Sequence, residues 1–288
     1  MSRPRGWCLR TTVVTIDAPI IMGILNVTPD SFSDGGLFVD PDLAVERAEA
    51  LVRDGAHIVD VGGESTRPGA DPVSPEEELR RAVPVVGRLA ERGHIVSIDT
   101  TKPEVAHAAL SAGAEIVNDV SGFRNPVMRE VAAQHKAGVV VMHMPGDPRT
   151  MQIDPRYEDV VGEVSRYLAA QARLCEAAGI RSESICIDPG FGFGKNLEHN
   201  LELLDRIGEL ADLGYVVMAG TSRKRFIGSI LGLEDPLARD FGTAVTVALA
   251  VERGISVFRV HDPSLSREAA LVARAIVGAR NTRRELSS

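Results

Sequence analysis

Eight short runs rich in valine and isoleucine recur along the chain, and they constrain its fold more than any other feature. Each run is too short for a helix, and each is followed by polar or glycine-rich residues and then by an amphipathic stretch. The runs are residues 20–27, 58–62, 95–99, 115–120, 139–143, 184–188, 215–219 and 256–261. We therefore expect eight buried strands, each followed by a loop and a helix.

The segments between these runs have apolar residues at helical spacing, which predicts amphipathic helices. The predicted buried faces are Ala44, Ala48, Leu51 and Val52, then Leu79, Val83, Val86 and Ala90, and later Leu265, Ala269, Val272 and Ile276. Strands that alternate with helices are mostly parallel, because each helix carries the chain back to start the next strand in the same direction.

Eight such units in 288 residues predict an α/β fold of the (β/α)₈ TIM-barrel type, which typically needs about 250 residues. A doubly wound sheet is the alternative, but its G-x-G-x-x-G turn does not follow the first run. We expect a single domain over residues 1–288, with its core at about 18–279. Two helical segments, 223–231 and 236–253, follow the seventh run, so an extra short helix is expected there.

The charge balance and the apolar pattern exclude several classes of protein. There are 32 Lys plus Arg against 40 Asp plus Glu, and the net charge of −8 argues against a nucleic-acid partner. No apolar run approaches the roughly 18 residues of a membrane span, so no membrane partner is expected. The arginine-rich start lacks the apolar stretch of a signal peptide, which predicts a cytoplasmic protein. Three widely spaced cysteines without a C-x-x-C pair indicate neither disulfides nor zinc.

Polar residues stand at the carboxyl ends of most predicted strands, where barrel enzymes collect their catalytic groups. They are Asn26, Asp60, Asp99, Asn118, Asp119, His143, Asp188 and His261. Each Asp or Asn alone could be a helix N-cap that contributes roughly 1 kcal/mol. Together they would meet at one mouth of the barrel, where buried carboxylates need cationic or hydrogen-bonding partners. The set therefore favours an active site.

Two glycine-rich loops, 62–69 and 188–195, follow the second and sixth runs, and neither has the spacing of a Walker A loop. The second loop carries Phe191 and Phe193 in a chain with only 4% aromatic residues. A planar ligand could stack on these rings while Asp188 accepts hydrogen bonds from its edge. The loop therefore favours a flat heterocycle rich in N–H groups, with a merely flexible turn as the alternative.

Three consecutive cations, Arg223, Lys224 and Arg225, stand at the start of a predicted helix, where they oppose the helix dipole unless an anion binds. Arg259 and His261 lie two residues apart in the eighth run and therefore share one face of the strand. Anion sites after strands seven and eight recur in barrels. We expect an anionic part of the ligand to bind there, although a surface charge run remains the alternative.

Ordered motifs cover most of the chain: 23–36 (GILNVTPDSFSDGG), 62–69 (GGESTRPG), 97–100 (SIDT), 118–122 (NDVSG), 142–144 (MHM), 188–195 (DPGFGFGK), 222–224 (SRK) and 259–261 (RVH). In these motifs the chain resembles the dihydropteroate synthase family, the folate-pathway enzymes that sulfonamides inhibit. The resemblance implies a transferase that joins 6-hydroxymethyl-7,8-dihydropterin diphosphate to 4-aminobenzoate with Mg²⁺, releasing pyrophosphate and forming 7,8-dihydropteroate. It also implies a homodimer.

The resemblance implies a role for each matched residue. The pterin edge should be held by Asp99, Asn118, Asp188 and Lys224, and its faces should be lined by Phe193 and Met142. Asn26 should face Mg²⁺ and the diphosphate, and the diphosphate should be gripped by Arg259 and His261. Residues of two loops should close over the site and shape the 4-aminobenzoate pocket: Ser33, Asp34, Ser65, Thr66, Arg67, Pro68 and Gly69. The groups expected to act in catalysis are Asp99, Asp188, Lys224, Arg67, Arg259 and His261.

The sequence departs from the family pattern at two positions. Arg225 stands where many members carry Ser, and Pro145 stands where Gln is usual. Arg225 could bind the carboxylate of 4-aminobenzoate. Two other functions are weighed against the synthase. A pterin-dependent methyltransferase would leave the cations at 222–225 and 259–261 unexplained, and a catalytically silent pterin-binding paralogue would not need the intact loops at 30–36 and 64–69.

Overall fold

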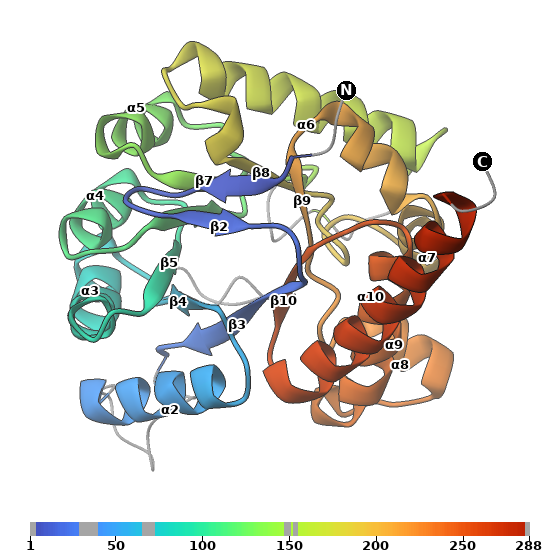
Figure 1. The fold of residues 1–288 in the computed structure, drawn as a ribbon. Helices are drawn as coiled ribbons and strands as arrows, with labels where there is room; N and C mark the ends of the chain where they lie inside the picture. Colours follow the sequence, from blue (N-terminus) through green and yellow to red (C-terminus); the bar gives the residue numbers. More distant parts are fainter. Residues whose placement is uncertain (1–3, 29–39, 65–72, 147–150, 152–154, 286–288) are drawn as a thin grey trace.

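The computed structural model describes residues 4–28, 40–64, 73–146, 151 and 155–285. Eight parallel strands close a barrel in the order β10-β3-β4-β5-β6-β7-β8-β9, with helices around it (Figure 1). The strands are β3 (Ile20–Asn26), β4 (Ile58–Gly62), β5 (Ile95–Asp99), β6 (Ile116–Asp119), β7 (Gly138–Met142), β8 (Ile185–Asp188), β9 (Val216–Ala219) and β10 (Val257–Val260). The predicted TIM barrel is confirmed, and each predicted strand end differs from the observed one by at most one residue.

Several of the helices begin directly after a residue whose side chain caps the first turn. The helices are α2 (Pro41–Arg53), α3 (Pro75–Glu91), α4 (Pro103–Ser111), α5 (Pro126–His135), α6 (Val160–Ala177), α7 (Leu197–Asp205), α8 (Arg225–Leu231), α9 (Asp240–Glu252) and α10 (Pro263–Glu285), with short 3₁₀ turns η1 (Ser182–Ser184), η2 (Ile207–Leu213) and η3 (Pro236–Arg239). In α2 and α3 a proline at the start follows the N-caps Asp40 and Ser74, whose side chains accept backbone hydrogen bonds. The predicted extra short helix after the seventh barrel strand is α8.

The predicted helix faces differ in how well they match the structure. On α2 the face is confirmed, because Ala44, Ala48 and Leu51 are buried. On α3 the buried stripe is rotated, with Ala82 and Leu89 at its centre. This rotation brings Val86 fully into the core and leaves the other predicted positions only partly buried.

On α10 the predicted buried face was wrong for Val272 and Ile276, which are 62% and 56% exposed. The helix lies against α9 and buries its small residues Ser266 and Ala270. Helical spacing places Val272 and Ile276 on the side of α10 that faces away from Ser266 and Ala270.

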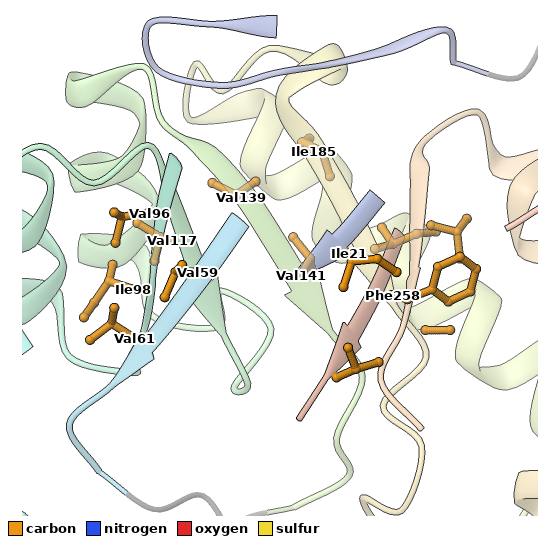
Figure 2. Close-up of a cluster of buried hydrophobic side chains, with 14 of the residues drawn as sticks. Ile21, Val59, Val61, Val96, Ile98, Val117, Val139, Val141, Ile185 and Phe258 are labelled. Atoms are coloured by element: carbon orange, nitrogen blue, oxygen red, sulfur yellow. The ribbon is translucent and has the colours of Figure 1, made fainter. Parts of the chain in front are cut away.

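Strand residues alternate between two apolar layers. One layer lies between the barrel and its helices and includes Val59, Val61 and Ile98 (Figure 2). The other fills the barrel and includes Ile58 and Ile116. Side chains two residues further along the same strands, including those of Asp60 and Asn118, share this inward direction and therefore converge at the carboxyl end of the barrel.

A two-stranded hairpin, β1 (Gly6–Cys8) and β2 (Val13–Thr15), covers the opposite end of the barrel (Figure 1). Trp7 is fully buried there, and its indole Nε1 donates a hydrogen bond to the carbonyl of Ser184 at 3.0 Å. The sequence did not predict this element, because two three-residue strands carry too short a pattern to be distinguished from a loop.

Candidate active site

Arg259 of β10 joins two carboxylates at the carboxyl end of the barrel. Its Nε lies 2.6 Å from Oδ2 of Asp60, and its Nη2 lies 2.5 Å from Oδ2 of Asp99. Asn118 Nδ2 donates to the same Oδ2 of Asp60 at 3.1 Å. The structure thus brings together three predicted site residues, Asp99, Asn118 and Arg259. It adds Asp60, which the sequence placed among the polar strand residues without assigning it a ligand or a catalytic role.

The charged groups of this cluster are buried, and their pKa values are shifted by burial and by one another. Burial raises the pKa of Asp99 above its ordinary value, although Arg259 opposes the rise. For Arg259, burial lowers the pKa, but Asp60 and Asp99 outweigh that effect and raise it. Oδ1 of Asp60 and Oδ1 of Asp99 are buried and accept no hydrogen bond from the residues described. Asp99 ends β5, so its buried Oδ1 is suited to an N–H donor from a ligand.

Asp188 ends β8 beside Met142, the last residue of β7. Its Oδ1 accepts a hydrogen bond from the backbone N–H of Gly190 at 2.7 Å, and burial raises the pKa of its carboxyl group. A Cβ atom at Gly220, after β9, would lie 3.4 Å from Oδ2 of Asp188. The backbone of Gly220 therefore lies next to the second carboxylate oxygen of Asp188.

Lys224 and Phe193 meet next to this carboxylate. Lys224 Nζ lies 4.0 Å from the centre of the Phe193 ring, a cation–π contact. Gly192, which precedes Phe193 in the chain, has φ +76°, and a Cβ there would lie 3.1 Å from Cδ of Lys224. Phe193 also packs against an apolar cluster that contains Met142. Phe193 and Met142, the two residues predicted to line a ligand ring, therefore belong to one apolar cluster.

Phe191 does not share the predicted stacking role. Its side chain is only 1% exposed, and its ring centre lies 6.3 Å from that of Phe226. The alternation within the loop explains the difference: Phe191 turns into the core beneath α8, while Phe193 is only partly buried.

His261 is oriented by Ser222. The Ser222 hydroxyl oxygen accepts a hydrogen bond from the backbone N–H of His261 at 3.1 Å, and it lies 2.9 Å from Nδ1 of the same residue. The hydroxyl proton can therefore point to Nδ1, which leaves the proton of the neutral ring on Nε2. In this tautomer His261 presents an N–H donor.

The sequence predicted that the three consecutive cations form one anion site. In the structure their side chains have different surroundings. Arg223 is paired with Asp240, with Nε and Nη2 at 2.8 and 2.7 Å from its carboxylate oxygens. Arg225 is the exposed first residue of α8. Of these three cations, Lys224 is the one in contact with Phe193 beside Asp188. The acid that compensates Arg223 lies 17 residues further along the chain, so local sequence could not reveal it.

Two other polar strand ends have structural roles. The carboxylate of Asp119 accepts backbone hydrogen bonds from Ser121 and Phe123 at 2.7 and 3.0 Å. His143 is buried against Lys195, whose Nζ lies 3.0 Å from its Nδ1. Lys195 Nζ also donates to the carbonyls of Gly190 and Phe193. The sequence missed this lysine as a support for the loop, because its acceptors are backbone carbonyls.

Of the remaining predicted site residues, the structure describes Asn26 but not those of the two loops. Asn26 ends β3 with a partly buried side chain. Ser33, Asp34, Ser65, Thr66, Arg67, Pro68 and Gly69 lie outside the described residues. Within the described ranges, no group of three or more His, Cys, Asp or Glu residues could hold a metal ion. In the same ranges, no helix is long and apolar enough to cross a membrane.

Comparison with known proteins shows the family to which the chain belongs. Residues 22–261 match a family model described as pterin binding enzyme. The dihydropteroate synthase of Escherichia coli (strain K12) is 45% identical over 274 residues, which cover 95% of this chain and 97% of the relative. The chain belongs to the dihydropteroate synthase family. Its predicted function as a dihydropteroate synthase, a transferase, is thereby confirmed in preference to the methyltransferase alternative.

Two solved structures of dihydropteroate synthase from Xanthomonas albilineans resemble most of this chain. The structure with 4-aminobenzoic acid has a TM-score of 0.89 at 44% identity, covering 96% of this chain and 98% of that one. The structure in complex with 7,8-dihydropteroate has a TM-score of 0.85 at 42% identity, covering 94% and 98%. The likeness to the dihydropteroate synthase family therefore extends over the barrel and its connecting segments.

Proposed function

We propose that this protein joins 6-hydroxymethyl-7,8-dihydropterin diphosphate to 4-aminobenzoate, releasing pyrophosphate and forming 7,8-dihydropteroate. The observation that carries the proposal is the convergence of Asp99, Asn118 and Asp188 with Arg259 at one end of the barrel. Buried acceptors suit the N–H edge of a pterin, and the cation beside them suits its diphosphate.

The pterin is held by Asp99, Asn118 and Asp188, together with Lys224. Asp188 accepts hydrogen bonds from the pterin ring, and Asn118 both donates and accepts. Phe193 and Met142 line the ring faces, because they belong to one apolar cluster beside Asp188. Lys224 is held next to the pterin ring by its contact with the side chain of Phe193.

The diphosphate is bound by Arg259 and His261, which present N–H donors on one face of the β10 end. The carboxylate of 4-aminobenzoate is bound by Arg225 or by residues of the two loops. By their resemblance to the family, Ser33 and Asp34 in one loop, and Ser65, Thr66, Arg67, Pro68 and Gly69 in the other, contact this second substrate. Of the loop residues, Arg67 acts in catalysis.

In the proposed order of events, the bond between the pterin methylene and the diphosphate oxygen breaks first, and the electron pair leaves with pyrophosphate. The neutral amine of 4-aminobenzoate then forms the new C–N bond and loses a proton. The acidic groups at the mouth, Asp99 and Asp188, stabilise the positive charge on the pterin, so no strong base is required.

Mg²⁺ fits the oxygen donors present. Asn26 ends β3 with a partly buried side chain, at the same end of the barrel as Arg259 and His261. Mg²⁺ commonly takes one or two protein oxygens together with substrate phosphates and water. When bound through Asn26, it would neutralise charge on the departing diphosphate.

A homodimer forms through the side of the barrel that carries α8, η3, α9 and α10 (Figure 1). Most of the exposed large apolar side chains gather on these elements: Ile230, Leu231, Leu237, Phe241, Val245, Leu249, Leu271, Val272 and Ile276. A concentration of exposed apolar side chains on neighbouring elements is a feature of protein–protein interfaces. A second copy of the chain is the occupant that the family resemblance implies.

The chain is proposed to be a single domain, 1–288, that works in the cytoplasm. The cysteines Cys8, Cys175 and Cys186 are free. Free thiols are typical of a reducing compartment.

The test is to incubate the purified protein with the pterin diphosphate, 4-aminobenzoate and Mg²⁺, and to follow pyrophosphate and dihydropteroate together, with and without a sulfonamide. We expect equal amounts of both products and inhibition by the sulfonamide. A protein that binds the pterin but forms neither product would be the silent paralogue. Omission of 4-aminobenzoate is the control for uncoupled hydrolysis of the diphosphate.

A further inference from the structure

Asp60 is a charged residue in the middle of β4 whose side chain is completely buried. It pairs in register with Ser97 of β5, whereas Asp99 pairs with Gly62. Asp60 therefore lies one layer of side chains below Asp99, above the apolar layer that contains Ile58. It has no role in the proposed function, and a carboxylate at this depth has lost the solvation it would have in water.

One oxygen of Asp60 serves two proposed ligand-binding residues. Oδ2 accepts hydrogen bonds from Nε of Arg259 at 2.6 Å and from Nδ2 of Asn118 at 3.1 Å. Asp99 then binds Nη2 of the same guanidinium at 2.5 Å. Two contacts to different nitrogens fix the plane of a guanidinium, because its five N–H donors form a rigid fork. The guanidinium N–H groups that do not bind Asp60 or Asp99 can donate hydrogen bonds to an anion.

We infer that Asp60 is a positioning residue that holds Arg259 in the orientation in which it binds the diphosphate of the substrate. The inference rests on the proposed function, because it assumes that Arg259 binds the diphosphate. Asp60 does not touch the substrate. Through its hydrogen bond it orders the long side chain of Arg259 before the ligand binds, so that binding costs less conformational entropy.

Stability alone does not explain a carboxylate at this position. The next layer of side chains inside the barrel, which contains Ile58, is apolar. Buried ion pairs can often be replaced by apolar residues with no loss of stability. The register partner Ser97 is also buried and polar, yet its hydroxyl has no hydrogen-bond partner among the described residues. Ser97 is therefore a matched control, because it lies in the same layer without contacting Arg259.

The experiment compares two ligands in calorimetry: 6-hydroxymethyl-7,8-dihydropterin diphosphate and the same pterin without the diphosphate. We expect Asp60→Asn to reduce the preference for the diphosphate ligand about tenfold or more, as for the loss of a charge-assisted contact. An effect through Asn118 would weaken both ligands alike and would cancel in the ratio. Ser97→Ala should leave the preference unchanged.

A double-mutant cycle decides whether Asp60 acts through Arg259. In an Arg259→Met background, Asp60→Asn should change the preference by less than about twofold, because the residue to be positioned is gone. An undiminished effect there, or equal loss for both ligands in Asp60→Asn alone, would overturn the inference. If Asp60→Asn does not fold, Asp60→Glu, which keeps the charge but displaces it, is expected to reduce the same ratio.

Failure of the proposed function gives a different result. If the wild-type protein prefers the diphosphate ligand but forms no dihydropteroate, the synthase activity is refuted while the role of Asp60 is still decided by the ratio. If the wild-type protein shows no preference for the diphosphate ligand, the inference about Asp60 is itself overturned.

Discussion

Nζ of Lys195 lies 3.0 Å from Nδ1 of His143, and both side chains are buried. Burial lowers the pKa of Lys195 to about 7, and burial together with the neighbouring Lys195 lowers the pKa of His143 to about 3. The histidine therefore accepts a hydrogen bond as a neutral ring. Since Lys195 also binds the carbonyls of Gly190 and Phe193, this contact ties β7 to the loop that carries Phe193.

The first prediction is a loss of stability in acid that depends on His143. The unfolded chain protonates this histidine near its ordinary pKa of 6.5, whereas the folded protein resists protonation down to about 3. The unfolded state therefore binds more protons in this window, and the contribution of His143 falls as pH drops through it, by on the order of 5 kcal/mol in total.

The measurement is the free energy of unfolding by urea as a function of pH for the wild type and His143→Gln. Glutamine can accept a hydrogen bond from Lys195 through its amide oxygen but does not titrate. The variant should show a shallower decline between about pH 6.5 and 3. Identical slopes in the two proteins would refute the assignment.

The second prediction concerns Asp188→Asn. We expect it to weaken pterin binding by on the order of 1.5–3 kcal/mol, because the ligand loses a charge-assisted hydrogen bond. Calorimetry with the pterin lacking the diphosphate measures the effect directly. Unchanged affinity would remove Asp188 from the pterin site, and a matched melting temperature is the control for correct folding.

The third prediction concerns Trp7→Ala in the hairpin that covers the amino end of the barrel. Trp7 is fully buried, so its loss should lower the free energy of unfolding by about 3–5 kcal/mol. The pterin affinity of the folded variant should not change, because the site lies at the other end of the barrel. In the same hairpin Val13 is 56% exposed, and Val13→Ala should cost less than about 0.5 kcal/mol. Similar melting temperatures for the two variants would contradict this account.

The fourth prediction tests the proposed dimer face. Phe241 is 71% exposed on α9, so Phe241→Glu should dissociate the dimer without lowering the stability of the isolated subunit. Sedimentation equilibrium measures the mass of the species in solution. Leu174→Glu on α6 is the control, because Leu174 is 46% exposed but lies outside the face. A monomeric wild type, or a dimeric Phe241→Glu, would refute the proposed interface.

Much of the fold could be predicted because it depends on local pattern. The strands 58–62 and 95–99 were predicted at their observed bounds, since an apolar run between polar segments is itself the signal for a buried parallel strand. The candidate site could be predicted in part for the same reason: Asp99, Asn118 and Asp188 lie at strand ends, and the ends of parallel strands meet.

The errors arose where the decisive partner is distant in the chain. Arg223 was predicted to bind an anion, but Asp240 neutralises it from the start of α9. Val272 was predicted to be buried, but α10, which packs against α9, buries Ser266 and Ala270 instead. Neither outcome leaves a trace in the neighbouring sequence, because both depend on how helices pack.

The sequence by itself determined the barrel, the family and the end of the barrel that holds the polar groups, because periodicity and motif order are properties of the chain. Only the tertiary structure decided which polar groups act on one another. Arg259 and Asp60 are separated by 199 residues and lie in strands on either side of β3, yet their charged atoms lie 2.6 Å apart. That contact exists because the barrel closes, and closure brings together side chains that the sequence keeps far apart.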